Sequence, residues 1–141
     1  MVCSSADDAT RVLSQLKITI RTNYSNPPTH GAQVVAMVLD NPALRTMWED
    51  ELAGMRLRIK QIRALLQNKL QNKLNSTGVA QDFNFITRQR GMFSYSGLSK
   101  PQMHRLRDEF AVYGVDTGRI CVAALNTRNI DAVVSAIVQV L

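Results

Sequence analysis

The sequence is poor in cysteine and has no long apolar run. Two cysteines, Cys3 and Cys121, are too few for a disulfide framework, so we expect free thiols in a reducing compartment. The longest apolar runs, such as residues 34–39, fall well short of the ~20 residues of a membrane span. The first residues also lack the basic and apolar regions of a signal peptide. These absences predict a cytoplasmic protein that does not enter a membrane.

Several kinds of catalytic motif are also missing. The two histidines, His30 and His104, have no cysteine or carboxylate at metal-ligand spacing, which argues against a zinc site. The chain has no glycine-rich phosphate loop, no nucleophile elbow and no HExxH motif. We find no pair of residues that would serve as general acid and base. The sequence therefore predicts no metal site and no catalytic residue of its own.

The composition is that of an ordinary globular protein with excess positive charge. Apolar residues make up 45% of the 141 residues, charged residues make up 20%, and the net charge is +6. The basic residues are dispersed except for one cluster, which lies between apolar residues at helical spacing and is interpreted as the solvated face of a helix. A nucleic-acid-binding face is the alternative. The cluster consists of Arg56, Arg58, Lys60, Arg63, Lys69 and Lys73.

The first forty residues predict two helices. Ser5 is a suitable N-cap, with acidic residues in the first turn and apolar residues at spacings of three and four up to about residue 23. Residues 24–28 must interrupt the helix because Pro27 and Pro28 remove two backbone donors. A short apolar helix is expected over residues 29–39.

The clearest pattern is one long amphipathic helix. Asn41 and Pro42 are typical of a helix start, and apolar residues then recur every three or four positions up to residues 75–78. The span is about 50 Å, whereas a globule of this length is about 30 Å across. We therefore expect the helix to protrude or to contact polypeptide outside this chain; a dimerisation stripe is the alternative. The stripe comprises Leu44, Trp48, Leu52, Met55, Ile59, Ile62, Leu66, Leu70 and Leu74.

The second half predicts a β–β–α–β–α order, and hence a small α/β sandwich with helices covering one sheet. β-prone segments occupy residues 83–86, 92–95 and 119–125, and residues 112–115 form a short extended piece. Residues 99–102 read as a capping box before a helix, and Asn126 or Thr127 is expected to cap the last helix.

Two arginines occupy unusual positions. Arg119 lies between the turn 116–118 and an apolar strand, where an unpaired buried charge would cost several kcal/mol. It is therefore either paired internally, for example with Asp116, or available to a ligand carboxylate as a bidentate donor. Arg21 lies at a helix end, where it complements the helix dipole or binds a ligand.

Three stretches resemble aspartate and aromatic-amino-acid aminotransferases of class I, in the family's order. They are residues 20–31 (IRTNYSNPPTHG), residues 90–98 (RGMFSYSGL) and residues 105–123. The resemblance covers nearly the whole chain and corresponds to the C-terminal third of such an enzyme. It implies a fold-type I homodimer that depends on pyridoxal phosphate (PLP). It also implies three parts: a helical segment with an arginine loop (1–40), a connecting helix (41–78) and a small α/β domain (79–141).

The resemblance also implies roles for five residues. Arg119 matches the arginine that binds the substrate α-carboxylate. Arg21 matches the arginine that reaches the neighbouring subunit's site and binds the distal carboxylate of dicarboxylic substrates. Ser25 and Asn26 flank that loop and shape the pocket, and Phe93 matches an aromatic residue that excludes water at its mouth.

None of the five lysines matches the family's Schiff-base lysine. Residues 97–100 imitate its serine–lysine signature, but Pro101 follows and a helix begins there. The resemblance thus implies that the lysine and the cofactor contacts lie upstream, outside this chain. We expect a fragment of an enzyme that transfers an amino group between aspartate or an aromatic amino acid and a 2-oxo acid, inactive when isolated and without nucleic acid or membrane partners.

Overall fold

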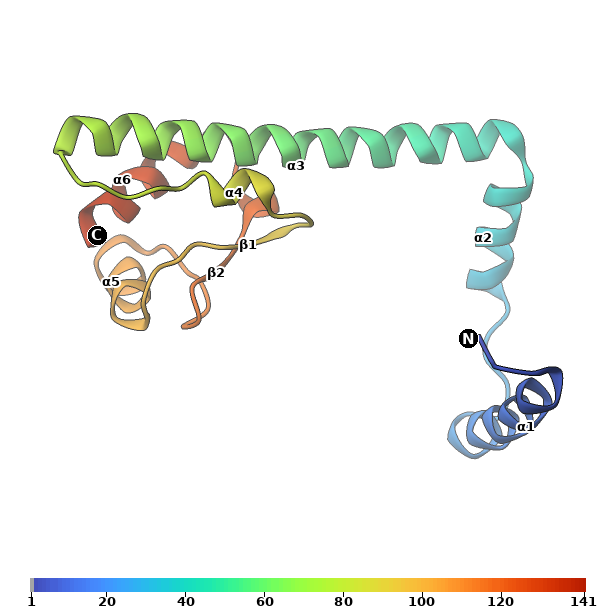
Figure 1. Cartoon of the computed structure of the whole chain (residues 1–141). Helices are drawn as coiled ribbons and strands as arrows, with labels where there is room; N and C mark the ends of the chain where they lie inside the picture. Colours follow the sequence, from blue (N-terminus) through green and yellow to red (C-terminus); the bar gives the residue numbers. More distant parts are fainter. Residues whose placement is uncertain (1) are drawn as a thin grey trace. The chain divides into compact units, whose positions relative to one another are not determined.

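The computed structural model describes residues 2–141 and divides the chain into two compact units (Figure 1). The first unit ends at Glu49 and the second comprises Asp50–Leu141. Helix α3 (Pro42–Thr77) contributes residues to both units. We describe each unit by itself.

The first unit contains α1 (Ala6–Asn23), α2 (His30–Asp40) and the first turns of α3. The predicted caps are confirmed: the Asp8 amide donates to Ser5 Oγ at 3.1 Å, and the amides of Ala43 and Leu44 donate to Asn41 Oδ1 at 3.0 and 3.2 Å. Neither α1 nor α2 contains a buried residue. The apolar side chains of this unit therefore have no core of their own among the described residues.

The predicted long helix is confirmed as α3, but its apolar stripe has two different environments. Leu66, Leu70 and Leu74 are fully buried in the core of the second unit. Residues 67–74 contain the sequence Gln-Asn-Lys-Leu twice in succession, and this repeat keeps leucine on the same side of the helix because its period of four residues is about one helical turn. Trp48 and Met55, earlier in the stripe, are 43% and 59% exposed.

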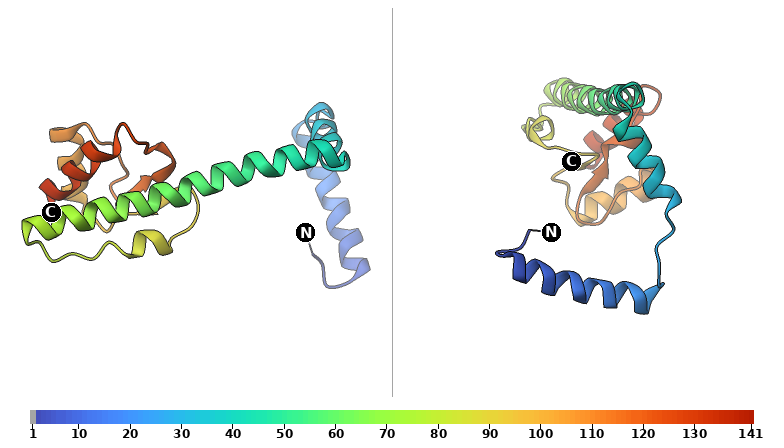
Figure 2. Two further views of the ribbon diagram at one scale, coloured as in Figure 1. Left: turned by 90° about the horizontal axis from the view of Figure 1, so that it is seen from above. Right: turned by 90° about the vertical axis from the view of Figure 1, so that its right-hand side faces the viewer.

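The second unit packs three helices around a small sheet. Strands β1 (Phe93–Tyr95) and β2 (Arg119–Cys121) are antiparallel. Helices α5 (Lys100–Phe110) and α6 (Ile130–Val140) pack with α3 around one apolar core. Seen from above, α4 (Phe85–Arg88) lies on one side of α3, and α5 and α6 lie on the other (Figure 2). A short 3₁₀ helix, η1 (Val122–Ala124), follows β2.

The capping box at the start of α5 is confirmed, since the Ser99 amide donates to Gln102 Oε1 at 2.8 Å. The last helix begins later than expected, at Ile130, with Asn129 as its N-cap. Asn126 instead closes the preceding turn, where its Oδ1 accepts from the amides of Arg128 and Asn129.

The predicted sheet was too large, and the described chain is mostly helical with two short strands. Residues 85–88 form a helical turn because the Asn84 amide donates to Asp82 Oδ1, and Phe83 and Ile86 are buried together at a spacing of three. Residues 112–115 form no strand, and the strand expected over 119–125 ends at Cys121, where η1 begins. Among the helices of residues 2–141, none combines the length and the apolar character needed to cross a membrane.

Candidate functional site

Arg119 and Phe93 lie together at one face of the two-stranded sheet. The antiparallel register pairs Arg119 with Tyr95 and Phe93 with Cys121, so Arg119 and Phe93 are diagonal neighbours. The Arg119 guanidinium carbon lies 4.9 Å from the centroid of the Phe93 ring, a cation–π distance. Both side chains are exposed, contrary to the expected burial of Arg119.

The predicted alternative, an internal salt bridge between Arg119 and Asp116, does not form. Asp116 is bound instead by Lys100 Nζ and His104 Nε2, each at 3.2 Å. These two groups lower the pKa of the Asp116 carboxyl, chiefly through hydrogen bonds from Lys100 and then His104. Within residues 2–141 no ion pair involves Arg119.

The turn before Arg119 requires glycine. Gly118 has a φ of +83°, and a Cβ added there would lie 2.7 Å from the Leu98 carbonyl oxygen. Its own carbonyl accepts from the amide and the hydroxyl of Ser96, at 2.8 and 2.7 Å. These contacts fix the position at which β2 begins and hence the position of Arg119.

Arg63 is a buried arginine that ties α3 to β1, and sequence reasoning missed it. Its side chain is 3% exposed and donates to the carbonyls of Ile86 and Gly91, at 3.0 and 2.9 Å, and to that of Phe93. Burial and the neighbouring Arg90 guanidinium lower the pKa of Arg63. Because Arg63 holds the Phe93 backbone, it contributes to the position of the aromatic ring.

Arg58 connects α3 in a similar way to η1 and to the residue that follows it. Its guanidinium donates to the carbonyls of Ala123 and Leu125, at 3.2 and 2.8 Å. The interpretation of the basic cluster as a solvated face is therefore wrong for Arg63 and incomplete for Arg58. The helical spacing of α3 already indicated that Arg63 could be buried. Arg63 lies one turn before Leu66 and next to Ile62, at the edge of the buried stripe.

The remaining predicted residues, Arg21, Ser25 and Asn26, belong to the first unit. Arg21 lies in the last turn of α1, is exposed, and forms no ion pair with any described residue. Ser25 adopts a left-handed conformation with φ of 66°, and its amide donates to the Ile20 carbonyl at 3.1 Å. The Asn26 amide donates to the Tyr24 carbonyl at 2.8 Å. The structure thus groups these three residues at one helix end, while Arg119 and Phe93 belong to the second unit.

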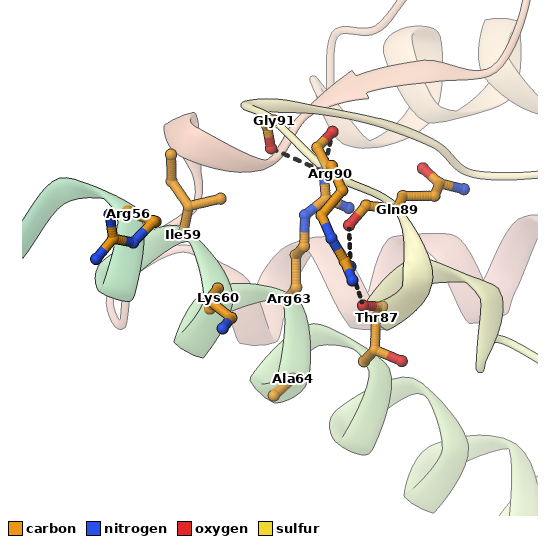
Figure 3. A pocket seen from close by; sticks show the side chains of 9 residues that line it. All are labelled: Arg56, Ile59, Lys60, Arg63, Ala64, Thr87, Gln89, Arg90 and Gly91. Carbon is orange, nitrogen blue, oxygen red and sulfur yellow. Dashed lines mark hydrogen bonds between the residues drawn. The ribbon is translucent and has the colours of Figure 1, made fainter. Parts of the chain in front are cut away.

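The second unit also contains a cavity of about 600 Å³ between α3 and residues 87–91 (Figure 3). Four of the residues that line it are basic, and none is acidic. Among residues 2–141 there is no group of three or more His, Cys, Asp and Glu residues placed to hold a metal ion.

Comparisons with known proteins agree on one family. The family model described as "Aminotransferase class I and II" matches residues 1–137. The sequence is 55% identical over all 141 residues to an aspartate aminotransferase of Pseudomonas aeruginosa, covering 34% of that protein. It is 47% identical over 141 residues to an aromatic-amino-acid aminotransferase of Escherichia coli, again covering 34% of that protein.

A solved structure shows the same similarity in three dimensions. The aromatic-amino-acid aminotransferase of Burkholderia pseudomallei, covalently bound to pyridoxal phosphate, superposes with a TM-score of 0.88 and 58% identity. The alignment covers 99% of this chain and 34% of that one. The chain therefore spans about a third of the length of the relatives that it matches.

Proposed function

Because this chain belongs to the class I and II aminotransferases, a family that uses PLP, we propose that it supplies the substrate-carboxylate-binding part of such an enzyme. The reaction transfers an amino group between an amino acid, aspartate or aromatic, and a 2-oxo acid, in a cytoplasmic homodimer. The observation that carries the proposal is the Arg119 guanidinium, which stacks on Phe93 and has no carboxylate partner among the described residues.

In this proposal Arg119 binds the α-carboxylate of the substrate. A guanidinium offers two parallel N–H donors that match the two oxygens of a carboxylate. The Phe93 ring covers one side of the guanidinium. The apolar ring displaces water from that one side of the otherwise exposed guanidinium, which strengthens an ion pair with the substrate. Phe93 therefore favours the bound carboxylate without touching the reacting atoms.

Arg21 is the proposed group for the distal carboxylate of a dicarboxylic substrate. The left-handed Ser25 and the turn at Asn26 redirect the chain after α1, which leaves Arg21 at an exposed helix end. In the homodimer this helix end would enter the neighbouring subunit's site. A substrate with two carboxylates then meets two guanidinium groups, whereas an aromatic substrate needs only Arg119.

PLP, when bound, supplies the stabilisation of a carbanion, and it requires a lysine together with a partner for its pyridinium nitrogen. The lysines here do not fit that role. Lys69 and Lys100 are paired with Asp131 and Asp116, and Lys73 donates to Ser135. Lys60 lines a cavity that has no acidic residue, and Lys17 is an exposed residue of α1 that forms no ion pair with any described residue. We therefore assign no catalytic step to this chain, and we expect polypeptide outside it to provide the cofactor site.

A dimerisation or scaffold role is the second candidate, favoured by the exposed apolar side chains of Trp48, Leu52 and Met55 on α3. In the aminotransferase proposal the same side chains contact the rest of the enzyme. A nucleic-acid-binding role has less support, since Arg58 and Arg63 of the basic cluster are committed to backbone carbonyls.

A chimaera tests the proposal. This chain replaces the matching segment of the Pseudomonas aeruginosa aspartate aminotransferase, to which it is 55% identical. We expect the purified chimaera to bind PLP and to transfer amino groups from aspartate or phenylalanine to 2-oxoglutarate. The isolated 141-residue chain, as a control, should show no turnover. A folded, PLP-loaded chimaera without transamination would contradict the proposal, and so would turnover by the isolated chain.

A further inference from the structure

The cavity between α3 and residues 87–91 is lined by an unusual set of side chains. Arg56, Lys60 and Arg63 project from α3, and Arg90 comes from the opposite segment (Figure 3). The other lining residues are Ile59, Ala64, Thr87, Gln89 and Gly91. The wall thus combines an apolar surface with four positive charges and no carboxylate.

No acidic side chain neutralises these four charges elsewhere among residues 2–141. The ion pairs formed by described residues involve Arg45, Lys69, Lys100, His104, Arg105 and Arg107 as cations. Clustered cations without a counterion repel each other, and the Arg90 guanidinium accordingly contributes to the lowered pKa of Arg63. The cavity therefore lacks the negative charge that would stabilise it.

Hydrogen-bond donors at the cavity are also unused. Arg63 is 3% exposed, and its Nε has no hydrogen-bond acceptor among the described residues. Arg90 uses one nitrogen, Nη1, for the carbonyls of Thr87, Arg88 and Gln89. Its Nε and Nη2, and the side chains of Arg56 and Lys60, make no hydrogen bond within the described part of the chain.

From this geometry we propose that the cavity binds a small organic anion with two or more carboxylate or phosphate groups on an apolar frame. The anionic groups of this ligand contact Lys60, Arg56 and the Nε and Nη2 atoms of Arg90. Its apolar frame packs on Ile59 and Ala64. A volume of about 600 Å³ lies in the range of small-molecule sites, which combine apolar walls with a few charged groups. The proposal uses neither Arg119 nor Arg21, so it stands or falls independently of the proposed function.

Titration of the purified chain with named probes tests the proposal. Benzene-1,3-dicarboxylate and phenyl phosphate represent the two sources of anionic oxygen, and benzene-1,3-dicarboxamide is the neutral control. We expect at least one anion to bind, with changes in the amide NMR signals of Ala64 and Gly91, and we expect no response to the diamide. The anion with the lower Kd identifies the preferred group.

Variants that each remove one positive charge distinguish a specific binding site from nonspecific electrostatic attraction of the anion to a basic protein. Lys60→Gln and Arg56→Gln should each weaken binding about tenfold, because a hydrogen bond to a charged group contributes on that order. Neither side chain has a hydrogen-bond partner among the described residues, so both variants should fold. Arg128→Gln removes the same charge from an exposed position outside the cavity and should leave the Kd unchanged. The proposal is overturned if neither anion binds at millimolar concentration, if Arg128→Gln weakens binding equally, or if the responding amides lie outside the cavity.

Discussion

The guanidinium of Arg119 lies over the ring of Phe93, 4.9 Å from its centroid, at the face of a sheet that has only two strands. Backbone pairing of β1 with β2 produces this contact, because Phe93 and Arg119 are diagonal neighbours in the antiparallel register. The turn at Gly118 fixes the start of β2, and the hydrogen bonds of Arg63 to the Gly91 and Phe93 carbonyls fix the start of β1. A short sheet can therefore hold one exposed arginine in a defined position.

Arg21→Ala in the chimaera should change substrate preference. If Arg21 binds a distal carboxylate, its loss removes a charge-assisted contact that only dicarboxylic substrates make. We expect kcat/KM for aspartate to fall about 100-fold and that for phenylalanine to change less than about threefold, since 1.36 kcal/mol corresponds to a factor of ten. Steady-state kinetics with both substrates measures this. Equal losses for the two substrates would refute the assigned role.

Arg63→Met should strongly destabilise the second unit. The variant leaves buried acceptors at Ile86, Gly91 and Phe93 without their donor. We expect the free energy of unfolding to fall by about 3–5 kcal/mol, as measured by urea unfolding with far-UV circular dichroism. Arg56→Met, on the same helix but without a hydrogen bond, should change it by less than about 0.5 kcal/mol. Similar stabilities of the two variants would contradict the structural role of Arg63.

Gly118→Ala and Gly54→Ala should have opposite effects on stability. At Gly118 the added Cβ meets the Leu98 carbonyl at 2.7 Å in a left-handed conformation, which should cost on the order of 2–4 kcal/mol. At Gly54, within α3, nothing lies within 4 Å of the added Cβ, so alanine should stabilise the helix by about 0.5–1 kcal/mol. Thermal unfolding of both variants shows whether each one raises or lowers the stability. A Gly118→Ala variant as stable as the wild type would show that this turn is not constrained.

Asp116 should contribute to the stability of the chain at neutral but not at acid pH. Hydrogen bonds from Lys100 and His104 lower its pKa in the folded state. A carboxyl with a lowered folded pKa contributes stability above its ordinary value of 3.8, and this contribution is lost as the pH falls through the lowered pKa. Asp116→Asn should therefore lower the urea midpoint at pH 7, by an amount that shrinks as the pH falls below 3.8. Asp50→Asn, which breaks no ion pair of the described residues, is the control. A wild-type advantage over Asp116→Asn that does not shrink as the pH falls below 3.8 would contradict the linkage.

The sequence predicted helices better than strands, for a physical reason. Caps at Ser5, Asn41 and Ser99 are local signals, and the structure confirms all three. Strand formation depends on a partner far away in the chain, so β-prone residues such as Phe85 could not show that a turn at Asp82 would make them helical. The two strands that form, β1 and β2, pair with each other in the antiparallel register that makes Phe93 and Arg119 diagonal neighbours.

The candidate site was predicted only in part. Arg119 and Phe93 came from the resemblance, and no spacing rule would have paired residues 26 positions apart in the sequence. The position of Arg63 at the edge of the buried stripe was visible in the sequence, but its acceptors were not, because they lie 23 to 30 residues later, in the segment from α4 to β1. The basic cavity could not be predicted either, because it depends on contacts between distant parts of the chain. Arg90 joins Arg56 and Lys60 only after the chain folds back onto α3.

The most direct test of the carboxylate-binding role is the kcat/KM of Arg119 variants of the chimaera with aspartate and phenylalanine. Arg119→Ala should lower it by about 30-fold or more for both substrates, because a bidentate pair contributes about 2–4 kcal/mol. Arg119→Lys keeps the charge but loses the two parallel N–H donors of the guanidinium, and it should still lower kcat/KM about tenfold. Arg128→Ala, at an exposed arginine in no ion pair of the described residues, should retain full efficiency. Unchanged kcat/KM in a folded, PLP-loaded Arg119→Ala chimaera would contradict the account.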